Sequence, residues 1–198
     1  MKKFISLLSV LTIVPLLSGC FGVFLGAAAT TGVVAGQEST VGTQVDDTNL
    51  YWKIKGLYLQ HNAQDLLAGV NVKVIEGRVS LTGKVKTADA AVDAVRLAWQ
   101  PTGVKEVINE IQVIEESTLQ EIFQSKWIKT QAVAKITATK DVHSLNYSIE
   151  VVNGVVYLMG IAQDSDELDA VTNQISTIKG VEKVVSHVRI KNDPSRES

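Results

Sequence analysis

The stretch that decides the fold is Asn153-Gly154-Val155-Val156-Tyr157-Leu158-Met159-Gly160. Ile149 and Val151 alternate with polar residues before this stretch, and Val156 and Leu158 continue the apolar pattern after its Asn-Gly pair. An Asn-Gly pair between two such runs is a strong signal for a β-hairpin, because both residues tolerate the positive φ that the tight turn requires. Residues 147–160 are therefore predicted to form two antiparallel strands.

The same pattern occurs a second time in the chain. Residues 70–113 align with residues 147–190 at a constant offset of 77, without a gap over 44 positions, and nine of the aligned pairs are identical. The identical pairs include the glycines Gly77/Gly154, Gly83/Gly160 and Gly103/Gly180. Matching glycines at matching spacing indicate the same turns. The chain therefore contains a duplicated domain.

Each copy continues from the hairpin into a helix and a last strand. Apolar residues recur at helical spacing over residues 88–99, up to Pro101, and over residues 168–178, up to Gly180. Alternating apolar residues then predict strands at 107–113 and 184–190. An amphipathic helix precedes each hairpin, at 50–60 and at 125 to about 139. The expected order is α-β-β-α-β in each copy.

This order predicts an α+β fold of two tandem domains, each a three-stranded sheet with two helices on one face. We expect the first domain at residues 46–115, a linker at 116–124, the second domain at 125–191 and a flexible polar tail at 192–198. A unit of about 70 residues buries a modest core, so the copies are expected to pack against each other.

The first twenty residues have the features of an export signal. Lys2 and Lys3 precede the apolar run 4–17, and the small-residue sequence Leu17-Ser18-Gly19-Cys20 follows it. This segment resembles a bacterial lipoprotein signal, in which residues 1–19 are removed and Cys20 is covalently lipidated. Phe21 after the cysteine is typical of lipoproteins sorted to the outer membrane. Cys20 is the single cysteine, which excludes an internal disulfide.

Residues 20–45 are expected to be a lipidated apolar tether. Residues 21–37 are rich in glycine, alanine and threonine and carry no charge. Gly22 and Gly26, and Gly32 and Gly36, have the spacing of a dimerising membrane helix. The alternative is an apolar tether that lies on or near the bilayer beside the anchor.

Composition and charge exclude several functional classes. The chain has 198 residues, 45% hydrophobic and 20% charged, with a formal net charge of −2, which argues against a nucleic-acid-binding surface. Residues 77–85 have the wrong spacing for a phosphate loop and a valine at the magnesium position. His143 and His187 lack a catalytic constellation and are expected at the surface. We therefore expect no enzyme activity, no cofactor and no metal.

The residues also carry a family resemblance. The hairpin at residues 153–160 and the glycine-valine pair at 180–181 resemble the BON domain. The segments 41–47, 109–111 and 127–128 are similar to those of outer-membrane lipoproteins with two BON domains. The resemblance implies two BON-like domains on a lipoprotein of the outer membrane that faces the periplasm. It also implies that the first helix of the second domain binds anionic phospholipid and that the protein supports envelope integrity.

The residues of the predicted helix at 125–139 can be tested against that implication. At 100° per residue, Ile128, Ala132 and Ile136 form one stripe that is suited to the core. The opposite face is uncharged. Its members are Trp127, Thr130, Ala134 and Ala138. Tryptophan favours membrane interfaces, so this face is the candidate site for a phosphatidylglycerol-like membrane.

Four lysines flank this face, and no acidic residue lies between Ser125 and Lys140. The lysines are Lys126, Lys129, Lys135 and Lys140. Each lysine near an anionic surface contributes about 1 kcal/mol to binding. Thr137 and the small Ala132 depart from the larger aliphatic residues familiar in the family, which predicts a shallower apolar surface.

Two alternatives remain open for this helix. Trp127 could pack against the first domain and leave the lysines as a solvated face, or the helix could bind a periplasmic protein partner or a second copy of the chain. The first domain's helix also has apolar residues on two sides, and we interpret Trp52 and Leu59 as an interdomain or core contact. Trp99, just before Pro101, is expected in the core.

Overall fold

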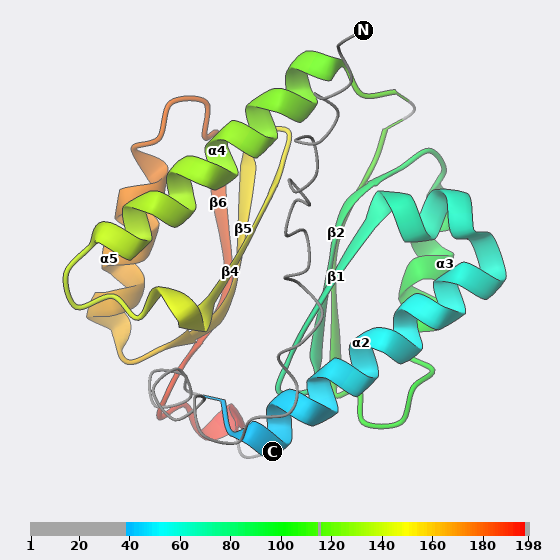
Figure 1. Ribbon diagram of the computed structural model, residues 1–198, viewed down its shortest axis with the longest axis horizontal. Helices are drawn as coiled ribbons and strands as arrows, with labels where there is room; N and C mark the ends of the chain where they lie inside the picture. The colour runs from blue at the N-terminus through cyan, green and yellow to red at the C-terminus, as the bar shows by residue number, and fades with distance from the viewer. Residues whose placement is uncertain (1–38, 115, 197–198) are drawn as a thin grey trace, which may run out of the picture.

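The computed structural model of the chain describes residues 39–114 and 116–196 and has two α+β domains, one for each copy of the repeat (Figure 1). The elements of the first domain are α2 (Val41–Asn62), the π-helical turn η1 (Ala63–Leu67), β1 (Val70–Ile75), β2 (Arg78–Val85), α3 (Ala88–Ala98) and β3 (Glu106–Val113). The elements of the second domain are α4 (Leu119–Ala138), η2 (Ser144–Asn146), β4 (Tyr147–Val152), β5 (Val155–Ala162), α5 (Ser165–Ser176), β6 (Lys183–Ile190) and the final turn η3 (Pro194–Arg196).

Both sheets have the same topology. The middle strand β2 pairs antiparallel with β1 and parallel with β3, and β5 pairs in the same way with β4 and β6. The hairpin turns at Glu76-Gly77 and Asn153-Gly154 have positive φ at both residues, as a tight two-residue turn requires. A side chain at Gly160 would place its Cβ 2.1 Å from the Asn146 carbonyl oxygen. The predicted fold class and the αββαβ order are confirmed.

The two leading helices begin earlier than expected. Thr40 starts α2, because its side-chain oxygen accepts a hydrogen bond from the Thr43 N–H at 3.3 Å. Thr118 starts α4 with a capping box, in which its hydroxyl accepts from the Glu121 N–H and the Glu121 carboxylate accepts from the Thr118 N–H. Capping of this kind satisfies the unpaired N–H groups at a helix start. As a result α4 includes residues 119–124, which had been expected in the linker.

Each domain has its own apolar core between its sheet and its two helices. In the first domain Ile54, Tyr58 and Leu81 are fully buried, and the Tyr58 hydroxyl donates to the Ala94 carbonyl oxygen at 2.9 Å. In the second domain Ile128 and Leu158 are fully buried. Burial of large apolar side chains on both sides of each helix–sheet contact fixes the helices against their own sheet.

The faces of the two sheets that carry no helices lie against each other (Figure 1). Arg78 Nη1 donates to the His187 carbonyl oxygen at 2.9 Å, and the His187 ring nitrogen Nε2 lies 2.8 Å from the Glu110 carboxylate. The Tyr157 hydroxyl lies 3.2 Å from the Gln112 amide nitrogen. These polar contacts join the two domains, as the small size of each core predicted.

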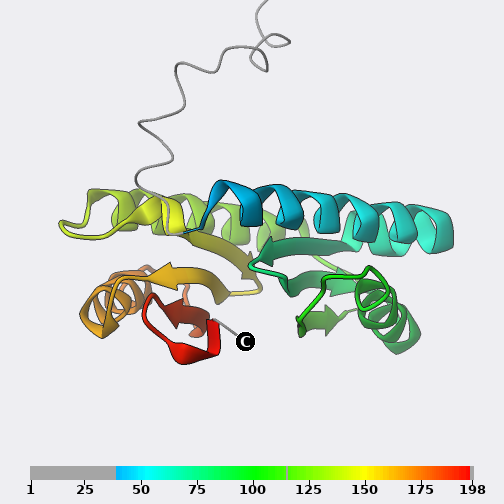
Figure 2. The ribbon, with the colours of Figure 1, turned by 90° about the horizontal axis from the view of Figure 1, so that it is seen from below.

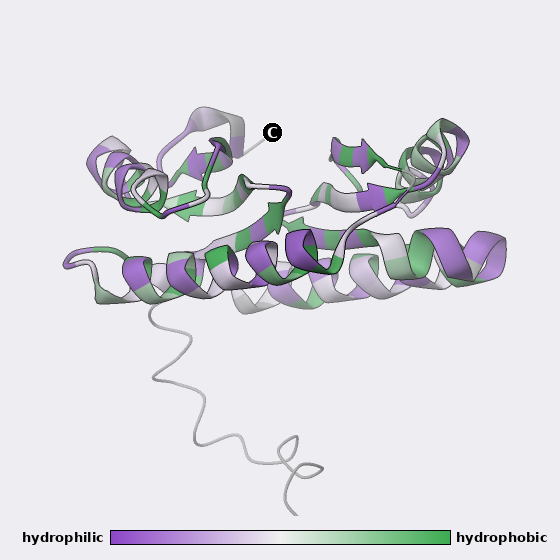
Figure 3. Cartoon of the chain, turned by 90° about the horizontal axis from the view of Figure 1, so that it is seen from above, coloured by the Kyte–Doolittle hydropathy of each residue, from purple (hydrophilic) through white to green (hydrophobic). Residues whose placement is uncertain are grey.

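This packing places the leading helices in one layer. Figure 2 shows α2 and α4 together along one side of the molecule, and α3 and α5 at its outer corners, away from that side. Figure 3 shows the same layer from the other direction, and the colours of Figure 1 show that α2 and α4 run antiparallel. The molecule therefore presents one side that is formed by two long helices.

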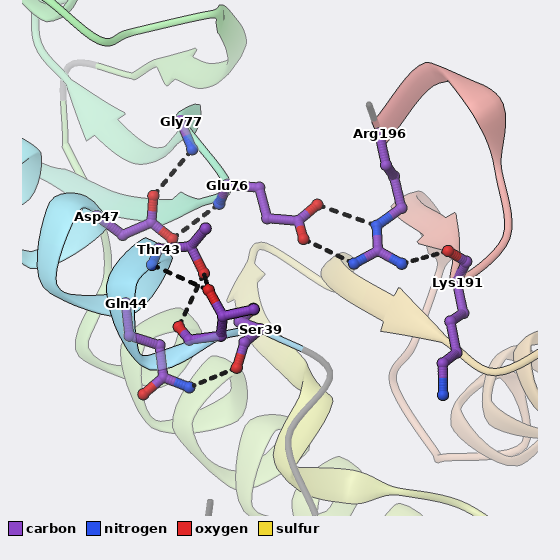
Figure 4. Close-up of polar contacts among 9 residues, drawn as sticks. Ser39, Thr43, Gln44, Asp47, Glu76, Gly77, Lys191 and Arg196 are labelled. Atoms are coloured by element: carbon purple, nitrogen blue, oxygen red, sulfur yellow. Dashed lines mark hydrogen bonds and ion pairs between the residues drawn. The ribbon is translucent and has the colours of Figure 1, made fainter. Parts of the chain in front are cut away.

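Polar contacts hold the beginning of α2 to the first hairpin and to the end of the second domain (Figure 4). The buried Asp47 carboxylate accepts from the N–H groups of Glu76 and Gly77, both at 2.8 Å. The Glu76 carboxylate in turn accepts two hydrogen bonds from the Arg196 guanidinium, at 2.7 and 3.1 Å. Arg196 lies in the segment that had been expected to be a flexible tail, and in the structure this segment forms η3 and contacts the first domain.

Candidate functional site

One side of α4 is committed to the core of its own domain. Ile128 and Ala132 are fully buried, and Ile136 is almost fully buried. Ile128 Cδ1 lies 3.4 Å from the position that a Cβ would occupy at Gly180. The predicted core stripe of this helix is confirmed, and the side opposite to it is free of the sheet.

The exposed side of α4 is apolar over a longer stretch than the sequence predicted. Trp127 is 47% exposed, so its ring is not sealed inside the protein. Phe123, one helical turn earlier, is 67% exposed, and Leu119, a further turn back, is also exposed. Ile122 and Val133 add to the same side. Sequence reasoning missed Leu119, Ile122 and Phe123, because it assigned residues 116–124 to a linker. The signal that could have found them is the Thr118-x-x-Glu121 capping box.

A shallow open groove lies along the same side of the helix. The residues that line it are Lys126, Lys129, Thr130, Val133, Ala134, Thr137 and Ala138. Five of the predicted site residues are among them, Trp127 is adjacent along the helix, and Lys135 lies elsewhere. Two alanines and two threonines keep the groove shallow. Of the two departures from larger aliphatic residues noted in the sequence, Thr137 lines the groove, whereas Ala132 is buried in the core.

The four lysines have different environments. Lys129 Nζ lies 2.8 Å from the Glu150 carboxylate, and Lys135 Nζ donates to the Thr177 hydroxyl at 2.8 Å. Lys140 lies 3.9 Å from its exposed neighbour Asp141. Within residues 39–114 and 116–196, no carboxylate pairs with Lys126. Lys126 is therefore the cation of the site with the greatest freedom to contact an anion, and Lys129 is partly neutralised.

The interpretation of the other tryptophans was wrong. Trp52 is 66% exposed and Leu59 is exposed as well, on the side of α2 opposite to the buried Ile54. Trp99 is 50% exposed, because it follows the last residue of α3 as its C-cap. In the described part of the chain, three tryptophans are therefore exposed to solvent: Trp52 on α2, Trp99 at the end of α3 and Trp127 on α4.

The histidines take part in structural contacts. His61 lies 2.9 Å from Asp93, and the exposed His143 lies 3.5 Å from the buried Glu167. His187 had been expected at the surface, but it is half-buried between the domains against Glu110. Among the described residues no group of three or more His, Cys, Asp or Glu side chains is arranged to hold a metal ion.

Shifted pKa values follow from burial and from ion pairs. Burial raises the pKa of the Tyr58 and Tyr147 hydroxyls. The hydrogen bond from Arg78 lowers the pKa of Glu106, and hydrogen bonds from Arg96 and His61 lower that of Asp93. All of these groups lie away from the groove on α4.

The predicted lipid anchor at Cys20, the signal at residues 1–19 and the tether up to residue 38 lie outside the described residues. Within the described residues, no helix combines the length and the hydropathy that a membrane crossing needs.

The duplicated αββαβ domain, with its paired glycine turns and sheets that lie face to face, defines a known class. The model of the BON domain family matches residues 46–115 and 124–192, and the chain belongs to this family. It is 33% identical over 170 residues to the outer membrane lipoprotein DolP of Haemophilus influenzae, an alignment that covers 85% of this chain and 87% of that protein. It is also 43% identical over 153 residues to a protein encoded in the gshII 5′ region of Anaplasma centrale, covering 77% of this chain and 99% of that protein. A 21 kDa hemolysin of Actinobacillus pleuropneumoniae is 32% identical over 147 residues, 74% of this chain and 75% of that protein.

Proposed function

We propose that this protein is a lipoprotein of the bacterial outer membrane, anchored through Cys20 and facing the periplasm, and that it binds anionic phospholipid through the exposed side of α4. The observation that carries the proposal is the run of exposed apolar side chains at Leu119, Phe123 and Trp127 beside the unpaired Lys126. Likeness to a relative named as an outer membrane lipoprotein supports the location. The binding supports the integrity of the envelope and involves no enzymatic step.

The physical basis is the combination of an apolar and an electrostatic contribution. A half-exposed tryptophan or phenylalanine that enters the interface removes apolar surface from water, and full burial of such a side chain contributes about 1.5–3 kcal/mol. Lys126 adds about 1 kcal/mol next to an anionic surface. The groove behind these residues is shallow, which suits contact with lipid head groups more than deep insertion.

The test is sedimentation with vesicles. The mature chain from Cys20, with Cys20→Ser to remove the anchor, is expected to bind vesicles that contain phosphatidylglycerol better than neutral phosphatidylcholine vesicles. Raising the ionic strength from about 0.01 M to 0.15 M shortens the Debye length from about 30 Å to 8 Å, so the preference for anionic vesicles should decrease.

A matched pair of variants locates the contact. Trp127→Glu should weaken binding about 100-fold, because it removes apolar contact and adds a charge that the leaflet repels. Trp99→Glu should bind like the unmodified chain, because Trp99 is equally exposed but belongs to α3, which lies away from the side formed by α2 and α4 (Figure 2). Equal weakening by both variants, or indifference to vesicle charge, would contradict lipid binding by α4.

A protein-interaction scaffold is the competing function for the same helix. The pairing of Lys129 with Glu150 favours it, because this pairing leaves the exposed side more apolar than the sequence suggested. An amphipathic helix with apolar residues one turn apart can also fill a groove on a protein partner. If only substitutions outside α4 weakened vesicle binding, α4 would not be the lipid contact, and its exposed side would be assigned to a protein partner.

A further inference from the structure

The exposed side of α2 has no role in the function proposed above. Val45, Trp52 and Leu59 are each more than half exposed and lie seven residues apart, which places them on one stripe of the helix. The buried side of the same helix carries Leu50 and Ile54 against the first sheet. A helix with apolar residues on both sides has one side that its own domain does not use.

We propose that this stripe of α2 is a second membrane-contact surface, and that α2 and α4 rest on the same leaflet together. The proposal rests on the proposed function, because α4 supplies the orientation. The occupant is the lipid bilayer, and three observations favour it over a protein.

The first observation is the arrangement of the two helices. α2 and α4 lie in one layer on one side of the molecule, with α3 and α5 away from that side (Figures 2 and 3). A planar surface that meets α4 from that side also meets α2. A groove also joins α2 to the second domain, because Thr48 and Tyr51 of α2 line it together with the exposed Leu145 of η2.

The second observation is where the anchored chain joins the folded part. α2 begins at Val41, directly after the tether that leads back to Cys20. About 19 residues can span at most on the order of 60 Å. A lipid on Cys20 therefore keeps the beginning of α2 within about 60 Å of the leaflet, and α2 is the first element of the described fold after the anchor along the chain.

The third observation is the chemistry of the stripe. Trp52 makes an edge-on contact with Tyr51 at 5.0 Å between ring centroids, and aromatic residues of this kind favour the membrane interface. The charges nearby nearly cancel, because Asp46 and Lys53 are both exposed. Lys55 turns inward, with its Nζ donating to the carbonyl oxygens of Leu67 and Val70. Contact through α2 is therefore apolar, whereas contact through α4 has an electrostatic part.

The three tryptophans provide the experiment. Three variants of the full mature, lipidated chain each keep one tryptophan, at position 52, 99 or 127, with phenylalanine at the other two. Each is reconstituted in phosphatidylglycerol-containing vesicles with brominated acyl chains, which quench tryptophan on contact. Emission of Trp52 and Trp127 should be quenched and shifted to the blue, and emission of Trp99 should not. Circular dichroism confirms that each variant is folded.

The outcomes separate this proposal from the function on which it rests. Quenching of Trp127 alone would overturn contact through α2 and leave lipid binding by α4 intact. No quenching at Trp52 or at Trp127 would overturn both. A Trp52 emission shift that depends on protein concentration in the absence of vesicles would assign the stripe to a second copy of the chain and also overturn the proposal.

A binding measurement adds a second readout. In the unlipidated Cys20→Ser chain, Trp52→Glu should weaken binding to the same vesicles about tenfold. Because α2 contributes apolar contact, the part of this factor that comes from the lost indole should persist at high salt, where the repulsion of the new carboxylate and the effect of the lysines on α4 both decline. An unchanged affinity for Trp52→Glu, as expected for Trp99→Glu, would contradict the proposal.

Discussion

The helices α2 and α4 occupy the same place in their two domains and differ on the side that faces away from the core. Leu50 lies 3.6 Å from the Cβ position of Gly103, and Ile128 lies 3.4 Å from that of Gly180. These two glycines are repeat partners, so Leu50 and Ile128 are equivalent, at an offset of 78 in the helices. The core side has kept its large aliphatic residues, as packing against a sheet requires.

On the outer side the equivalent positions have different residues. The same offset pairs Trp127 with Asn49, Trp52 with Thr130, and Gly56 with Ala134. Each helix thus exposes a tryptophan, but at a different place on its surface. Neither tryptophan packs in the core of its domain. The exposed apolar residues of the two helices are therefore independent of the core packing that the two copies share.

The largest expected effect is a loss of stability when a buried carboxylate is removed. Each domain has one such carboxylate, and the two do not occupy equivalent positions in the repeat. Asp47 accepts two backbone N–H groups of the first hairpin, and Glu167 accepts those of His143 and Gln163 at 2.6 and 2.7 Å. Asp47→Ala and Glu167→Ala should each lower the free energy of unfolding by about 2–4 kcal/mol, because buried N–H groups lose charged acceptors.

Denaturant unfolding measures this loss. Ser125 is the control, because it occupies the position in α4 that Asp47 occupies in α2. Among the described contacts, Ser125 makes none that is comparable to those of Asp47. Ser125→Ala should change stability by about 0.5 kcal/mol or less. Equal effects at Asp47 and Ser125 would show that the two helices are held in the same way after all.

The contact between the domains depends on Arg78, whose partner position in the second domain is Val155. Arg78 is buried, and its Nε donates to the Glu106 carboxylate at 2.6 Å. Arg78→Met should lower the free energy of unfolding by about 1.5–3 kcal/mol, the contribution of a hydrogen bond to a charged group.

The pKa of Glu106 gives a readout of its ion pair with Arg78, which lies within the first domain and orients the guanidinium that donates to the His187 carbonyl oxygen of the second domain. Arg78 lowers this pKa below the ordinary value of 4.5, so the carboxylate stabilises the folded state above that value and loses the contribution as the pH falls through the lowered pKa. NMR titration of the Glu106 side chain should show its pKa rising towards 4.5 in Arg78→Met. An unchanged pKa would mean that Arg189, 3.5 Å away, supplies the effect.

A smaller effect separates the lysines of α4. Lys126→Gln should weaken binding to phosphatidylglycerol vesicles about fivefold, which corresponds to about 1 kcal/mol for one lysine at an anionic surface. The double variant Lys129→Gln with Glu150→Gln removes an ion pair and keeps the net charge, so it should bind nearly as well as the unmodified chain. Vesicle sedimentation at low salt compares them, and a stronger effect of the double variant would place the lipid contact on the other edge of the helix.

The sequence predicted the parts of the fold that depend on local signals. Asn153-Gly154 and the matching glycines set the turns, and the spacing of Ile128, Ala132 and Ile136 placed the core side of α4. The starts of α2 and α4 were missed, because Thr40 and Thr118 act as caps whose effect depends on a few polar contacts. Missing the start of α4 also hid Phe123 from the candidate site.

The remaining errors come from contacts between distant parts of the chain. Whether an apolar residue on a two-sided helix is buried depends on where the other domain lies. This is why Trp52 was assigned to a contact that the structure does not make, and why His187 was expected at the surface. The pairing of Lys129 with Glu150 joins residues 21 positions apart, and neither residue type predicts it.

The smallest expected effect tests whether a glycine on the outer side of α2 lowers the stability of the helix. Gly56 lies within the helix, a Cβ there meets no atom within 4 Å, and its partner in α4 is Ala134. Gly56→Ala should raise the free energy of unfolding by about 0.5–1 kcal/mol, because alanine loses less conformational entropy in a helix. Ala134→Gly should lower it by a similar amount. Denaturant unfolding of both variants gives the comparison, and a loss of stability in Gly56→Ala would show that α2 needs a flexible point between Trp52 and Leu59, a requirement that α4 does not share.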